Sequence, residues 1–145
     1  METDMITFHK IGLSGQDQES SLNNSMMTIS NIKQLLNHED RDICYLKIDI
    51  EYSEWGSLSE ALSKGELRHV RQLGIEVHLR KILRGHYSHL ITYYSQVLRQ
   101  LEKAGFRKWK QHGNVECAFV SKVTGLMRYT CYELYYVNIN YRIKK

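Results

Sequence analysis

The sequence contains no proline and only three cysteines among its 145 residues. Cys44, Cys117 and Cys131 show neither the close spacing of a zinc site nor the density of a disulfide-stapled domain. Cys44 is expected to pack as a small apolar residue. Cys117 and Cys131 can meet across a hairpin, where a disulfide is the less favoured alternative to two free thiols.

The sequence also lacks long apolar runs and any tract of one charge. No run approaches the roughly 18 residues of a membrane-spanning helix, and the start, "METDMITFHK", lacks the basic-then-apolar layout of a signal peptide. Lys and Arg total 20 against 16 Asp and Glu, and the resulting charge of +4 is spread along the chain. The chain is therefore expected to be soluble as given, and its charge indicates no nucleic-acid partner.

The hydrophobic periodicity predicts strands alternating with helices, followed by two strands with no helix between them. Expected strands are "MITFHKIGL", "ICYLKIDI" and "QLGIEVHL", and expected helices begin at Thr28 or Ser30, span 57–71 with a break near Gly65, and cover 84–105. The last two strands, "FRKWKQHGNVECAFV" and "TCYELYYVNINYRI", are expected to pair antiparallel around Gly125. This order predicts a single α/β domain with a mostly parallel sheet and a C-terminal antiparallel hairpin at one side.

Polar side chains follow two of the predicted strands. Asp49, Glu51 and Glu54 come at the end of "YLKIDI", and Glu76 and His78 repeat the arrangement at the end of "LGIEVHL". Ligands of open α/β sheets bind beyond the carboxyl ends of the strands. Residues two apart share one side of a strand, so Asp49 and Glu51 are expected to face one ligand together.

Three interpretations of these groups stay open. Water and helix caps can satisfy polar groups at strand ends, which makes them purely structural. Alternatively they line a ligand crevice. A metal site that would serve a hydrolase is the weaker third option, because Asp, Glu and His suit a divalent ion but no tight spacing such as HExxH is present. We therefore predict no metal.

Three segments carry a family resemblance: "YLKIDIEYSEW", "VRQLGIEVHL" and "VTGLMRYTCYELYYVN". They resemble consecutive blocks of the FkbM-related animal methyltransferase-like proteins, in particular the group of methyltransferase-like protein twenty-four. The resemblance extends from "FHKIGLSG" to "YYVN". It implies a Rossmann-like fold that binds S-adenosylmethionine, an activity that transfers a methyl group to an unidentified acceptor, and relatives that are often secretory or membrane-anchored.

The resemblance assigns roles to individual residues. Gly12 and Leu13, with Ser14, would lie near the adenine, and Asp49 and Glu51 near the methionine part of the cofactor. Glu54, Glu76 and His78 are the candidates for orienting the acceptor or removing its proton. The chain departs from the family pattern in two ways: no glycine-rich loop precedes "MITFHK", and Tyr52 and Ser53 replace the Gly-Ala pair of Asp-Ile-Glu-Gly-Ala-Glu-Trp.

The departures imply the C-terminal part of such a domain, without its first two strands. One flank of the strand "YLKIDI" would then be unpaired unless "MITFHKIGL" pairs with it, and an unpaired edge favours self-association. The alternative function is a non-catalytic remnant or interaction module that binds no cofactor.

Overall fold

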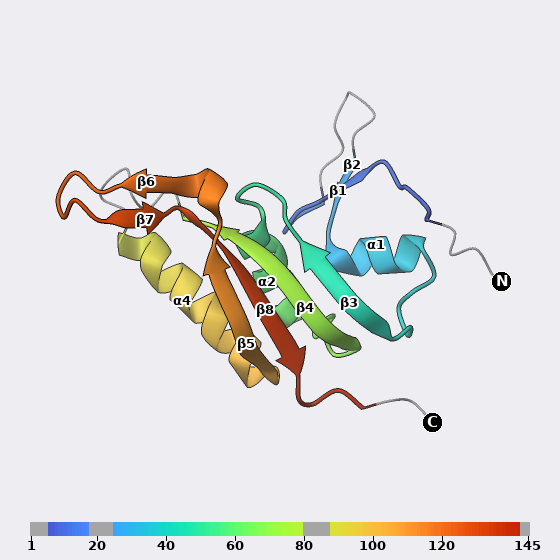
Figure 1. The fold of residues 1–145 in the computed structure, drawn as a ribbon. Helices are drawn as coiled ribbons and strands as arrows, with labels where there is room; N and C mark the ends of the chain where they lie inside the picture. Colours follow the sequence, from blue (N-terminus) through green and yellow to red (C-terminus); the bar gives the residue numbers. More distant parts are fainter. Residues whose placement is uncertain (1–5, 18–24, 80–87, 143–145) are drawn as a thin grey trace.

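The computed structural model describes residues 6–17, 25–79 and 88–142. Three helices and eight strands lie in these residues (Figure 1). The strands are β1 (Ile11–Leu13), β2 (Ser25–Met27), β3 (Ile43–Ile48), β4 (Val70–His78), β5 (Phe106–Gly113), β6 (Ala118–Val120), β7 (Met127–Tyr129) and β8 (Cys131–Asn138). The helices are α1 (Ile29–Leu35), α2 (Glu54–Ser63) and α4 (Ser88–Lys103), with a 3₁₀ turn, η1, at Val115–Cys117. The chain is therefore a mixed α/β protein.

The central sheet has the strand order β3-β4-β8-β5. β3 and β4 pair in parallel, and β8 runs antiparallel to both β4 and β5, so that β3, β4 and β5 point the same way. The predicted pairing of the last two long strands is confirmed, but the antiparallel strand lies inside the sheet and not at its side. The side chains of the two strands fit these places. Most residues of β5 are exposed, which suits an edge strand, whereas β8 buries every second or third residue, which suits an inner strand.

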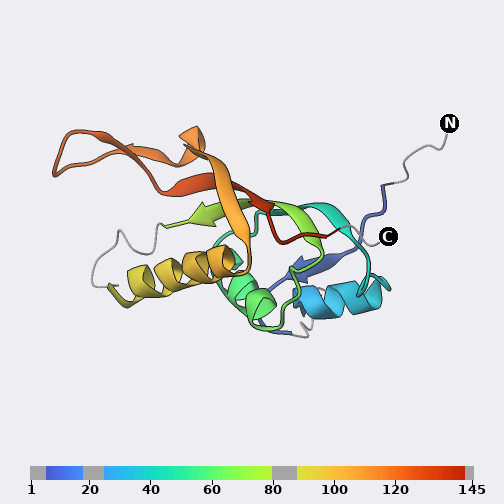
Figure 2. The same cartoon turned by 90° about the horizontal axis from the view of Figure 1, so that it is seen from below.

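The helices form one layer on one face of this sheet (Figure 2). Leu73, Ile75 and Val77 of β4 join the core with Val97 and Leu101 of α4. Because side chains alternate across a strand, Glu76 and His78 project toward the opposite face. This alternation directs Leu73, Ile75 and Val77 to the helices, and Glu76 and His78 to the site described below.

The helices begin and end where capping chemistry allows. Thr28, one of the two predicted caps, caps α1, and its hydroxyl accepts a hydrogen bond from the backbone N–H of Asn31. The second helix, predicted over 57–71, instead begins at Glu54 and ends before Gly65, which adopts a φ of +68°. The helix prediction over 84–105 is confirmed within the described residues by α4. Among these residues, no helix has both the length and the apolar character needed to cross a bilayer.

The N-terminal segment differs from its prediction. Only Ile11–Leu13 of "MITFHKIGL" forms a strand in the described chain, and Ile6 and Phe8 are exposed. β1 pairs in parallel with β2 in a separate two-stranded sheet and does not pair with β3. Within the described ranges, the outer edge of β3 therefore has no strand partner.

The cysteines also differ from prediction. Cys117 and Cys131 form a disulfide, with their Cα atoms 5.7 Å apart, at the base of the β6–β7 hairpin. Cys44 is an exposed free thiol and is not packed as an apolar residue. Gly125 turns the hairpin with a φ of +67°, as its position predicted.

Candidate functional site

A pocket of about 610 Å³ lies at the carboxyl ends of β3 and β4. Its wall brings together residues from both strand ends, from the turn after β3 and from the base of the β6–β7 hairpin. These are Asp49, Glu51, Tyr52, Glu76, His78, Asn114, Glu116, Cys117, Ala118, Phe119 and Thr130. Four of them are carboxylates and none is Lys or Arg, so we call it the acidic pocket.

His78 links a buried carboxylate to an exposed one. Its Nδ1 atom lies 3.0 Å from Oε1 of Glu54, whose side chain is fully buried. Its Nε2 atom lies 3.5 Å from Oε2 of Glu51, whose side chain is 79% exposed. A carboxylate can only accept hydrogen bonds, so a proton on Nδ1 would bond to Glu54, and Nε2 faces the pocket beside Glu51.

The first turn of α2 fixes this arrangement. Glu54 Oε1 also accepts the backbone N–H of His78 at 2.7 Å, and the Trp55 indole N–H donates to the His78 carbonyl at 3.2 Å. A carboxylate in the first turn is favoured by the helix dipole, which helps to explain how Glu54 is tolerated in the interior. Among the described residues, Glu54 Oε2 is buried without a hydrogen-bond partner. The end of β4 is therefore held rigidly against the start of α2.

Two further carboxylates of the site have partners on neighbouring strands. Glu76 accepts a hydrogen bond from the Asn114 side-chain amide at 2.7 Å. Glu133 of β8 forms an ion pair of 2.6 Å with Lys47 of β3, and the pair spans β4, which lies between these strands. Partial burial lowers the pKa of the Lys47 ammonium, but its bond with Glu133 and the charges of Glu133, Asp49 and Glu76 outweigh burial and raise the pKa. Negative charge therefore dominates this end of the sheet.

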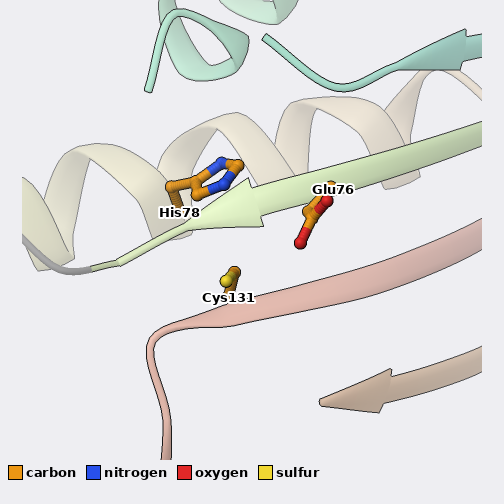
Figure 3. Close-up of side chains that lie close together, drawn as sticks. All are labelled: Glu76, His78 and Cys131. Atoms are coloured by element: carbon orange, nitrogen blue, oxygen red, sulfur yellow. The ribbon is translucent and has the colours of Figure 1, made fainter. Parts of the chain in front are cut away.

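Several of these side chains are close enough to share a cation. Ligand atoms lie within 4.8 Å of one another in Asp49, Glu51 and His78, and also in Asp49, Glu76 and Glu133. Glu76, His78 and Cys131 form a third group (Figure 3). In this group the sulfur of Cys131 is bonded to Cys117, so Cys131 offers no thiolate to a metal. The two oxygen-rich groups offer the ligand atoms that hard cations prefer, but their geometry identifies no particular ion.

The turn between β3 and α2 has an unusual backbone. Glu51 and Tyr52 both have positive φ values, +48° and +78°, in the left-handed region that favours glycine. The Tyr52 ring lies 5.0 Å from the His78 ring. Tyr52 occupies the position where the resembled family has Gly, and the backbone there adopts the conformation that Gly adopts without strain.

Tyr52 also separates the acidic pocket from a second pocket of about 470 Å³. This second pocket is lined mostly by hydroxyl, amide and glycine groups: Ser14, Gly15, Gln16, Tyr52, Ser53, Gly56, Ser59, Glu60, Ser63 and Tyr93. We call it the serine pocket. A Cβ atom on Gly15 would come within 2.7 Å of the Gly56 backbone, so glycine at 15 lets this loop rest directly on α2. Tyr52 lines both pockets and forms the wall between them.

The structure brings Asp49, Glu51, Glu76 and His78 together at one pocket, with Glu54 directly behind His78. Gly12 and Leu13 lie in β1 and line neither pocket: Gly12 faces Met26, and Leu13 packs against the core. Ser14, Gly15 and Gln16, which follow them, line the serine pocket.

Sequence reasoning missed the contribution of Asn114, Glu116 and Phe119. These residues reach the acidic pocket only because β8 inserts between β4 and β5 and carries the hairpin with it. No local pattern in the sequence announces that insertion. The positive φ values of Glu51 and Tyr52 had one indication in the sequence: Tyr52 stands where the resembled family has glycine.

Comparison with known families gives one match. A protein-family model described as a methyltransferase domain matches residues 1–135, a range that contains every residue lining the two pockets. Comparison with curated proteins and with solved structures gives no match.

Proposed function

Because the chain belongs to this methyltransferase domain family, we propose that it binds S-adenosylmethionine at the carboxyl ends of β3 and β4 and presents it to an acceptor. The observation that carries the proposal is the pair of pockets that meet at Tyr52. A transferase for two substrates needs two neighbouring binding sites with one boundary between them. The open end of a sheet whose β3, β4 and β5 point the same way supports a Rossmann-like arrangement.

The residues present suit the cofactor by their chemistry. Hydroxyl and amide groups of the serine pocket match the hydroxyl groups of a ribose, and Asp49 and Glu51 supply negative charge for the cationic methionine end. Gly12 and Leu13 would support the loop that carries Ser14, and would not themselves touch the ligand. Bound S-adenosylmethionine would supply an electrophilic methyl group.

The chain's own residues would serve the acceptor. With its proton on Nδ1, His78 can take a proton at Nε2 from an acceptor held in the acidic pocket. Glu54 would orient the ring and stabilise the imidazolium that results, a role that needs the buried bond at 3.0 Å. Glu76 is held by Asn114 and would position the acceptor by hydrogen bonding.

Within the family we propose that the chain is related to the FkbM-related animal group, because the segments around Asp49, Glu76 and Cys131 resemble it. We also propose that the chain corresponds to the C-terminal part of the longer domain. The unpartnered edge of β3 among the described residues supports this.

Calorimetry of S-adenosylmethionine binding tests the proposal. We expect heat with the wild-type chain and at least about tenfold weaker binding for Asp49→Ala, because a charge partner of the cationic cofactor is lost. Glu39→Ala, an exposed carboxylate before β3, is the matched control and should bind like the wild type. No heat at millimolar cofactor from a folded chain would contradict cofactor binding and favour the non-catalytic interaction module.

A further inference from the structure

A second surface lies outside the two pockets, on the β6–β7 hairpin. Figures 1 and 2 both show this hairpin extending beyond the end of the central sheet. Six of the thirteen exposed large apolar side chains in the described chain lie between Val115 and Met127. Such a concentration on one short segment marks an interaction surface, whereas single exposed apolar residues elsewhere need no explanation.

The apolar side chains are gathered at the end of the hairpin. Val120 and Met127 are direct cross-strand partners and are 63% and 60% exposed. Val123 and Leu126 continue the surface around the turn, at 93% and 56%. We call these four residues the hairpin tip.

The tip is held in this exposed arrangement. The Ser121 N–H donates to the Leu126 carbonyl at 2.9 Å, and the Gly125 N–H donates to the Ser121 carbonyl at 2.8 Å. At the base, the Cys117–Cys131 disulfide and the bond from the Thr130 N–H to the Cys117 carbonyl at 3.0 Å tie the two strands together. A tip whose backbone is internally bonded can enter an apolar phase at low cost, because few backbone polar groups lose water without compensation.

Basic residues flank the apolar tip. Lys122 lies in the turn and Arg128 beside Met127, and both are exposed. Among the described residues neither pairs with a carboxylate. The acidic residue just before the hairpin, Glu116 in η1, lines the acidic pocket. Apolar side chains with Lys and Arg beside them are typical of segments that enter the interface of anionic bilayers.

We propose that the hairpin tip docks on the surface of a membrane that contains anionic lipids. A bilayer fits this surface better than a protein does, because a stable protein interface needs about 800 Å² per partner and aromatic or Arg anchors in a packed centre. The four residues of the hairpin tip are aliphatic or thioether side chains at the end of a narrow ribbon, so the tip has no aromatic anchor and no packed centre. Shallow insertion requires no complementary shape, and the hairpin contributes Ala118, Phe119 and Thr130 to the acidic pocket, so docking brings that pocket close to the lipid surface.

Vesicle flotation tests the proposal with the full chain. The wild type should float with vesicles of phosphatidylcholine and phosphatidylserine, and weakly with phosphatidylcholine alone. The double variant Val123→Asp/Leu126→Asp should bind at least about tenfold more weakly, because two apolar side chains are replaced by charges of the lipid's sign. Lys122→Glu/Arg128→Glu should lose about tenfold on anionic vesicles. All four positions are exposed, so circular dichroism should report an unchanged fold.

Leu35→Asp is the matched control, since Leu35 is 54% exposed on α1, far from the hairpin in both views. It should float like the wild type. A wild type that floats with neither vesicle, or a tip variant that floats as well as the wild type, overturns the proposal. A wild type that does not float but elutes as an oligomer, with the tip variant eluting as a monomer, would overturn it in favour of self-association. These outcomes are independent of cofactor binding.

Discussion

The Glu54 carboxylate bonds both the backbone and the ring of one residue, His78, which lies 24 positions along the chain. One oxygen, Oε1, accepts the backbone N–H at 2.7 Å and lies 3.0 Å from Nδ1. The bond to the backbone fixes where β4 ends, and the bond to the ring fixes which nitrogen faces the acidic pocket. Structure and proposed chemistry therefore depend on the same buried atom.

Removing that atom should cost stability. Glu54→Ala leaves the His78 N–H and Nδ1 without their acceptor in a buried site, and we expect the free energy of unfolding to fall by about 2–3 kcal/mol in urea titrations. Glu54→Gln keeps an amide oxygen for the backbone N–H and should lose less. If the Ala and Gln variants unfold at the same urea concentration as the wild type, the buried bonds do not hold this end of β4.

Tyr52 should report backbone strain. Tyr52→Ala and Tyr52→Gly both delete the ring that packs on His78, so their difference isolates the φ of +78°. We expect the Gly variant to be more stable than the Ala variant by about 1 kcal/mol, because only glycine adopts this conformation without strain. Equal urea midpoints for the two variants would contradict the strained turn. Both variants should also join the acidic and serine pockets into one crevice, visible in a crystal structure.

The buried pair of Lys33 and Glu66 should make stability depend on pH. Lys33 Nζ lies 2.6 Å from Glu66 Oε2, with 5% and 17% of the side chains exposed. Partial burial raises the pKa of Glu66, but the bonds from Lys33 and Ser30 outweigh it and hold the pKa below the ordinary value of 4.5. The stabilisation is therefore complete above pH 4.5 and is lost as pH falls through the lower folded-state pKa.

Glu66→Gln provides the comparison for this pair. At neutral pH the variant should be less stable by about 3 kcal/mol, since it leaves the Lys33 ammonium buried without its counter-charge. The difference between wild type and variant should shrink as pH falls below 4.5. Urea titrations of both proteins at each pH measure this difference in the free energy of unfolding. A difference that stays constant down to pH 2 would show that Glu66 does not stabilise the protein through its charge.

The disulfide should stabilise the hairpin. Cys117 and Cys131 are 14 positions apart, and closing a loop of this size in the unfolded chain is worth about 3 kcal/mol in the chain-entropy model. Urea titration with and without reductant measures the loss. Cys44→Ser should respond to reductant like the wild type, because Cys44 is a free, exposed thiol. A reductant effect that persists in Cys117→Ser/Cys131→Ser would have another origin.

Much of the fold was predictable from local patterns. The α/β class, the strand that begins at Ile43, the helix stripe of Tyr94, Val97 and Leu101, and the turn at Gly125 follow from hydrophobic periodicity and glycine, which act over a few residues. The predicted strand extended to Ile50, whereas β3 ends at Ile48. The clustering of Asp49, Glu51, Glu76 and His78 also followed, because the carboxyl ends of parallel neighbours share one edge of a sheet.

Other features depended on contacts between distant segments. The sequence by itself determined which residues are polar at the ends of β3 and β4, and that Tyr52 stands where the resembled family has glycine. Only the tertiary structure decided that β8 inserts between β4 and β5, that the hairpin therefore completes the acidic pocket with Asn114 and Phe119, and that Glu54 turns inward to His78. Strand order and side-chain pairing depend on how the apolar faces of distant helices and strands pack together. The periodicity of one segment does not specify which other segment will lie beside it.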